Sequence, residues 1–193
     1  MKTLRIIAPQ YDIGWEAKIE NKQTVERMLA SAPRADLILL PEMFDTGFTM
    51  RPERVAEPAE GDTLKWMQAL ASKYDALLCG SWPVQEQGNY YNRFFAVKPQ
   101  GSFAMYDKRY LFAYGGEDKA YRPGKNLELL EYKGWRIQPF ICYDLRFPVW
   151  MRNTRSADVY LLPANWPSSR ISHWSNLLRA RAIENQVYVC GVN

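Results

Sequence analysis

The sequence has little cysteine, a single histidine and no long hydrophobic run. Its three cysteines, Cys79, Cys142 and Cys190, are odd in number and irregularly spaced, so they form neither a disulfide framework nor a zinc motif. No segment approaches the roughly 20 apolar residues that a spanning helix needs. The first ten residues, interrupted by Arg5 and Pro9, do not have the pattern of a signal peptide. We therefore expect a cytoplasmic protein with no membrane partner and no bound metal.

Glycine-rich phosphate loops are also missing. Neither Gly-x-Gly-x-x-Gly nor Gly-x-x-x-x-Gly-Lys-Ser/Thr occurs, so we expect no nucleotide, flavin or other cofactor. The 25 Lys and Arg residues exceed the 21 Asp and Glu residues, which gives a net charge of +4. Because the basic residues are scattered along the chain, we expect no nucleic-acid partner. With 47% hydrophobic residues, the chain is expected to bury its core as a single domain over residues 1–193.

Short apolar runs alternate with longer helical patterns, and this alternation is typical of an α/β fold. Strands are expected at residues 4–8, 36–40, 76–80, 90–97, 102–106, 137–142, 159–162 and 187–192. Helices are expected at residues 16–30, from an N-cap at Asp62, at 148–156 and at 172–185. The turn Pro99-Gln100-Gly101 predicts a hairpin between the two strands that flank it.

Four chemically reactive side chains stand at or after the ends of predicted elements. Glu42, Lys108 and Cys142 each lie at the end of an apolar strand, where ligands bind in such sheets, and Glu117 lies in a glycine-containing loop. Each has a plain alternative. A buried cysteine is usually a small core residue, Glu42 can serve as a cap, and Lys108 can be a solvated charge. Glu117 can simply balance the charge of Lys119.

Five segments resemble the successive motifs of the nitrilase (carbon-nitrogen hydrolase) superfamily, in the same order and over nearly the whole chain. They are Leu-Leu-Pro-Glu-Met-Phe (39–44), Tyr-Asp-Lys-Arg-Tyr-Leu-Phe (106–112), Ile-Cys-Tyr-Asp-Leu-Arg-Phe-Pro (141–148), Pro-Ala-Asn-Trp-Pro (163–167) and Arg-Ala-Arg-Ala-Ile-Glu-Asn-Gln (179–186). Within the superfamily, the stretches at 111–119 and 146–153 most resemble the bacterial omega-amidases.

The resemblance implies a catalytic set of Glu42, Lys108 and Cys142, with Glu117 orienting Lys108 or the substrate nitrogen. The residue types suit amide hydrolysis. A thiol with a pKa of about 8.5 needs a base or a nearby cation to become a nucleophile. Glu42 is expected to take the thiol proton, while Lys108 and the backbone amide of Tyr143 stabilise the negative charge that develops on the substrate oxygen.

The resemblance further implies a small-molecule substrate, a short 2-oxo dicarboxylic acid monoamide such as 2-oxoglutaramate. Hydrolysis through a Cys142 thioester would release the 2-oxo acid and ammonia. Such a substrate carries a carboxylate, for which Arg146 is the candidate partner. The alternative for Arg146 is a structural ion pair with Asp144 or Glu42. The aromatic residues expected to wall the pocket are Phe44, Phe48 and Trp166.

The family fold is an αββα sandwich, and the resemblance implies a homodimer that pairs across the helices after Cys142 and before Asn185. Members of the family usually continue with further strands and a tail, whereas this sequence stops at Asn193. An uncovered sheet edge invites pairing. The expectation is therefore either a fragment of a longer product or an edge that a partner subunit covers.

Three other functional interpretations stay open. The chain could be a different amidase of the superfamily, acting on deaminated glutathione or on carbamoyl compounds. It could be a Cys-His hydrolase that uses His173, the single histidine, although His173 stands at the start of a predicted helix. It could also be a flavodoxin-like binding module with an inert thiol, since such folds support many non-catalytic functions.

Overall fold

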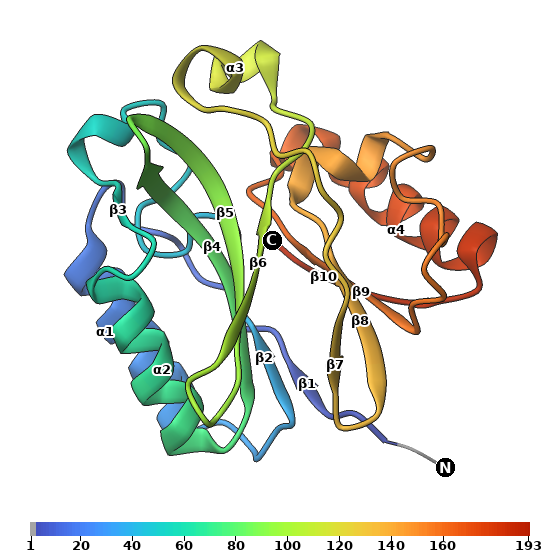
Figure 1. Ribbon diagram of the computed structural model, residues 1–193, viewed down its shortest axis with the longest axis horizontal. Helices are drawn as coiled ribbons and strands as arrows, with labels where there is room; N and C mark the ends of the chain where they lie inside the picture. The colour runs from blue at the N-terminus through green and yellow to red at the C-terminus, as the bar shows by residue number, and fades with distance from the viewer. Residues whose placement is uncertain (1–2) are drawn as a thin grey trace.

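Two β-sheets face each other in the computed structural model, which describes residues 3–193, and helices cover their outer faces (Figure 1). The first sheet has the order β1-β2-β4-β5-β6, with β3 beside β4. Its strands are β1 (Ile6–Ile7), β2 (Leu37–Leu39), β3 (Glu57–Pro58), β4 (Leu77–Glu86), β5 (Asn89–Val97) and β6 (Phe103–Asp107). The second sheet has the order β10-β9-β8-β7. Its strands are β7 (Leu130–Tyr132), β8 (Trp135–Pro139), β9 (Val159–Pro163) and β10 (Tyr188–Val192).

The helices form the two outer layers. The long helices are α1 (Lys18–Ala30), α2 (Asp62–Tyr74) and α4 (Ile171–Asn185), and α3 (Glu117–Ala120) is a single turn. Figure 1 shows α1 and α2 on the outside of the first sheet and α4 on the outside of the second. The predicted αββα sandwich is therefore confirmed.

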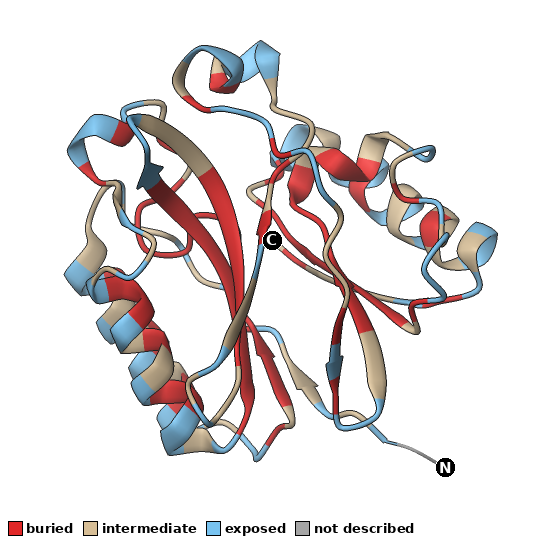
Figure 2. Ribbon diagram, viewed as in Figure 1, coloured by how far each residue is buried: buried red, intermediate tan, exposed pale blue. Residues whose placement is uncertain are grey.

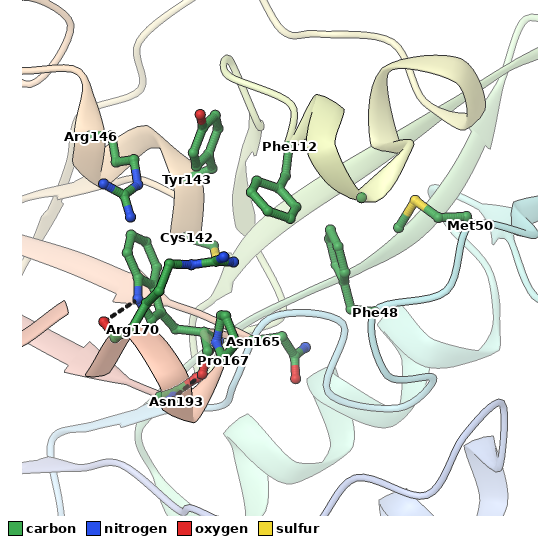
Figure 3. A pocket seen from close by; sticks show the side chains of 12 residues that line it. Phe48, Met50, Phe112, Cys142, Tyr143, Arg146, Asn165, Pro167, Arg170 and Asn193 are labelled. Atoms are coloured by element: carbon green, nitrogen blue, oxygen red, sulfur yellow. Dashed lines mark hydrogen bonds between the residues drawn. The ribbon is translucent and has the colours of Figure 1, made fainter. Parts of the chain in front are cut away.

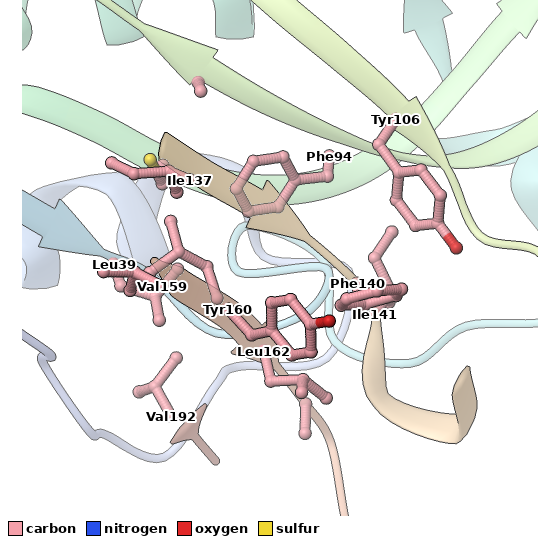
Figure 4. Packing of buried hydrophobic residues seen from close by; sticks show 14 of the residues in the cluster. Leu39, Phe94, Tyr106, Ile137, Phe140, Ile141, Val159, Tyr160, Leu162 and Val192 are labelled. Carbon is pink, nitrogen blue, oxygen red and sulfur yellow. The ribbon is translucent and has the colours of Figure 1, made fainter. Parts of the chain in front are cut away.

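Alternation along the central strands divides the apolar side chains between two cores. Leu37 and Leu39 of β2 pack into the core between the sheets, which also contains residues of β8, β9 and β10 (Figure 4). Ile38 and Leu40 point the other way and pack with Val25 of α1 and with residues of α2. Figure 2 shows the buried residues concentrated along these strands and on the inner sides of the helices. Burial on both faces explains why this strand is an uninterrupted apolar run.

Most predicted elements are found with shifted ends, and β4 shows the largest extension. It continues to Glu86 and forms a nine-residue-pair antiparallel ladder with β5. Gln87 and Gly88 make the connecting turn with φ angles of 49° and 76°. This left-handed pair is the geometry of a tight hairpin turn, but Gln87 is not one of the residues that signal it. The predicted hairpin between β5 and β6 is confirmed.

The helix predicted at residues 148–156 is wrong. The backbone N–H groups of Trp150 and Met151 both bond to the carbonyl of Phe147, which makes one turn, and the segment then loops. The side chain of Asn153 accepts a hydrogen bond from the backbone N–H of Ala157 and donates one to its carbonyl. Asparagine side chains that bond to nearby backbone compete with helix formation in this way.

The start of α2 also differs from the prediction. Gly61, rather than Asp62, occupies the N-cap, and Asp62 is the first helical residue. The carboxylate of Glu57 accepts a hydrogen bond of 2.7 Å from the backbone N–H of Thr63. The side chain of Glu57 therefore takes the place of an N-cap side chain, which Gly61 lacks, and satisfies one of the free N–H groups of the first turn.

Gly124 gives a testable constraint on the chain next to β6. Its N–H donates to the carbonyl of Lys108, and a Cβ at this position would lie 2.2 Å from the carbonyl oxygen of Asp107. We expect Gly124→Ala to lower the free energy of unfolding by about 3 kcal/mol, because the backbone must move to relieve this overlap. Urea denaturation measures the loss.

The matched control is Gly88→Ala, where nothing lies within 4 Å of the added Cβ. Its positive φ alone should cost about 1 kcal/mol. Equal losses in the two variants would contradict the steric argument.

Candidate active site

A buried charge cluster lies between the carboxyl ends of the strands. The ammonium of Lys108 lies 2.7 Å from Oε1 of Glu42 and 2.8 Å from Oε2 of Glu117. All three side chains are completely buried. The structure thus brings together three of the four predicted reactive residues, and the fourth, Cys142, interacts with Glu42 and Lys108. Lys108 is not a solvated charge, and Glu117 pairs with Lys108 rather than with Lys119.

Backbone pairing positions Glu42 after β2 ends. The N–H of Leu40 donates to the carbonyl of Cys79, and the N–H of Phe44 donates to that of Ser81. The Ser81 hydroxyl accepts from the N–H of Met43, which has a φ of 46°. The segment therefore runs along β4 and turns the Glu42 side chain into the space between the sheets.

Lys108 and Glu117 are held by neighbouring backbone. The N–H of Lys108 donates to the carbonyl of Asn92 and so extends the pairing of β6 with β5. Glu117 is the first residue of α3, where Oε2 accepts a hydrogen bond of 2.6 Å from the N–H of Phe112. The ring of Phe48 covers the ammonium of Lys108, with 5.1 Å between Nζ and the ring centroid.

Two asparagines that sequence reasoning missed complete the cluster. Nδ2 of Asn92 donates to Oε1 of Glu42 at 2.8 Å and to Oε1 of Glu117 at 3.1 Å. The backbone N–H of Asn165 donates to the other oxygen of Glu42 at 2.9 Å. Asn92 could have been found from the sequence, because it is an amide on the strand that carries the apolar residues Phe94 and Phe95.

Cys142 occupies a sharp bend rather than the end of a strand. It begins a 3₁₀ helix, Cys142–Arg146, and has a φ of 42°, a conformation that non-glycine residues adopt at a cost of about 1–3 kcal/mol. The buried carboxylate of Asp144 holds the bend, because it accepts hydrogen bonds from the N–H of Ile141, the hydroxyl of Tyr106 and the N–H of Tyr110. Burial raises the pKa of Asp144 to about 6, against these three hydrogen bonds, which lower it.

The charges in the cluster shift the pKa of the Cys142 thiol in opposite directions. Burial raises the pKa of Cys142, the carboxylate of Glu42 raises it further, and Lys108 partly offsets both. Burial alone would lower the pKa of Lys108, but the carboxylates of Glu117 and Glu42 raise it above its usual range. Burial raises the pKa of Glu117, against the attraction of Lys108. The resting state is therefore a neutral thiol beside a permanent cation, and a base must remove the thiol proton.

Cys142 opens onto a cavity of about 480 Å³ (Figure 3). The lining includes Phe48, Tyr143, Arg146 and Trp166, all expected at the site, and it also includes residues that were not expected: Met50, Phe112, Gly115, Asn165, Pro167, Arg170 and Asn193. The N–H of Tyr143 donates to no other residue in the described part of the chain. It stands directly after Cys142 and is available to a substrate oxygen.

Phe44 is not where it was expected. It does not line the cavity but lies in the core, stacked on Trp66 at 5.5 Å between ring centroids and edge-on to Trp82 at 6.0 Å. Phe44 lies on the same side of the sheet as Ile38 and Leu40, in the core beside the helices, so Glu42 is the residue that departs from this alternation.

The surroundings of Arg146 and His173 decide two alternatives, the structural ion pair of Arg146 and the Cys-His hydrolase. Nη2 of Arg146 lies 3.1 Å from Nδ1 of His173, and its guanidinium carbon lies 5.0 Å from the ring centroid of Trp166. No ion pair among residues 3–193 joins Arg146 to Asp144 or Glu42. His173 is exposed and is not part of the cavity lining, so a Cys-His arrangement is not formed with Cys142.

Residues 3–193 contain no group of three or more His, Cys, Asp or Glu side chains that could hold a metal ion. No helix in this range has the length and apolar character required to cross a membrane.

An αββα sandwich with a cysteine set beside a lysine and two glutamates defines a nitrilase-like hydrolase. The model of the carbon-nitrogen hydrolase family matches residues 5–193. The chain belongs to this family, as predicted, and is an enzyme that hydrolyses amides.

Relatives with known names match all or nearly all of the chain. It is 44% identical over 193 residues to the omega-amidase YafV of Yersinia enterocolitica, covering all of this chain and 75% of that protein. It is 32% identical to the 2-oxoglutaramate amidase of Bacillus subtilis over 190 residues, which is 95% of this chain and 73% of that protein. The crystal structure of XC1258 from Xanthomonas campestris, a CN-hydrolase superfamily protein with an arsenic adduct in its active site, superposes with a TM-score of 0.95 at 38% identity, covering 99% of this chain and 76% of the other.

Replacement of Lys108 tests the charge cluster. We expect Lys108→Met to lower kcat by a hundredfold or more, the typical cost of losing one donor to a developing oxyanion. Lys108→Arg should not restore the rate, because a planar guanidinium cannot occupy the fully buried space between Glu42 and Glu117. Steady-state ammonia release measures both effects, with circular dichroism to check folding. A near-normal rate in the Arg variant would mean that charge alone matters.

Proposed function

We propose that the enzyme hydrolyses the omega-amide of short 2-oxo dicarboxylic acid monoamides of the 2-oxoglutaramate type. The observation that carries the proposal is the composition of the cavity, which combines Cys142 with two guanidinium groups, those of Arg146 and Arg170, and no carboxylate in its lining. Such a cavity suits an amide whose far end is an anion. The names of the relatives, omega-amidase and 2-oxoglutaramate amidase, support the same substrate class.

Acylation begins with the neutral thiol of Cys142. Glu42 accepts the thiol proton as the sulfur attacks the amide carbon, so a C–S bond forms and the carbonyl oxygen becomes negative. Lys108 and the N–H of Tyr143 stabilise this oxygen. When the tetrahedral intermediate collapses, the C–N bond breaks and the protonated Glu42 returns its proton to the leaving nitrogen. Ammonia departs and a thioester remains on Cys142.

Deacylation uses the same base. Glu42, again a carboxylate, removes a proton from a water molecule that attacks the thioester carbon. The C–S bond then breaks, the sulfur recovers a proton from Glu42, and the 2-oxo acid leaves. Glu117 and Asn92 act as positioning residues, since they contact Lys108 and Glu42 rather than the reacting atoms.

A homodimer and a cytoplasmic location belong to the same proposal. Large apolar side chains are exposed on the side of the second sheet: Val149 is 80% exposed, Ile183 of α4 is 77% exposed and Tyr188 of β10 is 71% exposed. A second copy that covered them would bury apolar area on both partners. A reducing compartment would keep the nucleophilic thiol in its active form.

Replacing Cys142 and Glu42 tests the two half-reactions. We expect Cys142→Ala to abolish turnover without loss of folding, since the change removes the nucleophile and little buried volume. Glu42→Gln should stop acylation as well as hydrolysis, because one base serves both steps. Intact-mass spectrometry of Glu42→Gln with substrate should find no acyl-enzyme. A trapped thioester would show that another base drives the attack.

A substrate panel tests the function itself. Ammonia release is measured with 2-oxoglutaramate, 2-oxosuccinamate, glutamine, asparagine and simple nitriles. We expect the 2-oxo amides to be the best substrates, and glutamine to have a kcat/KM at least a hundredfold lower. Its ammonium would face two guanidinium groups with no carboxylate from the lining, and such like-charge contacts cost several kcal/mol. A preference for glutamine or for nitriles would refute the proposal.

A further inference from the structure

We propose that Arg170 anchors the carboxylate of the substrate and makes the enzyme selective for amides that carry an anion at the far end. This inference rests on the proposed function, because it names the group that recognises one end of that substrate. Arg170 belongs to neither the charge cluster nor the bend that carries Cys142. It reaches the cavity from the segment that connects β9 to α4.

The backbone of Arg170 is fixed by its neighbours. It is the last residue of the 3₁₀ turn Ser168–Arg170, and its N–H donates to the carbonyl of Pro167 at 2.9 Å. Its own carbonyl accepts a hydrogen bond of 2.9 Å from the indole of Trp166. Figure 3 shows the side chain extending from this point into the pocket towards Phe112. A long side chain on a fixed base presents its guanidinium at a restricted place.

The aromatic residues that Arg170 faces across the cavity are connected to Glu117 and Cys142. The guanidinium carbon lies 5.5 Å from the ring centroid of Phe112, whose ring packs edge-on at 5.1 Å against that of Tyr143. The N–H of Phe112 donates to Glu117, and Tyr143 follows Cys142. A cation–π contact of this kind does not use up the N–H donors of a guanidinium, which has five, so donors remain for a carboxylate.

The charge of Arg170 has no anion within the protein. None of the ion pairs formed among residues 3–193 includes Arg170, and the cavity lining contains no Asp or Glu. The buried arginines are different, since Arg93 binds Asp107 at 2.6 Å and Arg181 binds Glu184 at 2.7 Å. A half-buried, unpaired guanidinium beside a nucleophile is a receptor for a planar carboxylate, which it can bind through two parallel hydrogen bonds.

Arg146 has a different environment in the same cavity. Its Nη2 is engaged with His173, and its guanidinium covers the ring of Trp166. These contacts occupy part of its donor capacity, so Arg146 adds positive potential while Arg170 makes the direct pair. Replacing Arg170 and replacing Arg146 should therefore have different effects on substrate selectivity.

The test compares an anionic amide with a neutral one in Arg170→Gln, Arg146→Gln and the wild-type enzyme. For Arg170→Gln we expect kcat/KM on 2-oxoglutaramate to fall at least a hundredfold, mainly through KM. The fall in kcat/KM on butyramide should be at least tenfold smaller. For Arg146→Gln, the losses on the two amides should differ less than they do for Arg170→Gln. Arg27→Gln removes the same charge from the exposed side of α1 and should match the wild type within twofold. The inference would be overturned if Arg170→Gln lost equal activity on both amides, or if the losses on the two amides differed more for Arg146→Gln than for Arg170→Gln.

A binding measurement separates this inference from the proposed function. Calorimetry with glutarate, a dicarboxylate without a scissile bond, is carried out on Cys142→Ala and on Cys142→Ala combined with Arg170→Gln. We expect at least thirtyfold weaker binding in the double variant. Unchanged affinity would refute the role of Arg170 even if 2-oxoglutaramate is the substrate. Weakened affinity would support that role even if the panel identified a different anionic amide.

Discussion

The ion pairs of Lys108 with Glu42 and Glu117 are the constraint on which the rest of the site depends. Removing one partner from a buried pair of this kind typically costs about 3–5 kcal/mol, because the remaining charges have no water to solvate them. The residues that follow β6 and β2 supply the cation and one carboxylate, and the first residue of α3 supplies the other. These segments must therefore meet for any of the three charges to be tolerated, and the thiol of Cys142 is placed against charges whose positions are already determined.

The same cluster explains why the thiol is kept neutral until substrate arrives. A single cation is shared between two carboxylates, so little positive charge remains to stabilise a thiolate, and burial raises the pKa of Cys142. A neutral thiol is a poor target for oxidants and metals. Proton removal by Glu42 then becomes part of the reaction with the amide rather than a property of the resting enzyme.

The sequence predicted those parts of the fold and site that depend on local pattern. The apolar run that forms β2 and the motif residues after each strand identified the αββα class and the family. The motifs also named the three residues of the charge cluster and the nucleophile Cys142. Asn92 and Arg170 were missed because their roles arise from contacts with residues distant along the chain, Glu42 and Phe112. Phe44 and the segment after Pro148 were misjudged for a related reason. Phe44 shares the side of Ile38 and Leu40 although it lies two residues from Glu42, and the side-chain hydrogen bonds of Asn153 outweigh the helical pattern after Pro148.

Asn165 joins the two sheets at the proposed base, since its backbone N–H reaches a carboxylate oxygen of Glu42 across 123 positions of sequence. Of the partners of Glu42, Lys108 follows β6 and Asn92 belongs to β5, whereas Asn165 follows β9. Docking of the second sheet therefore completes a base whose other partners come from the first sheet, and the same docking brings Cys142 to it.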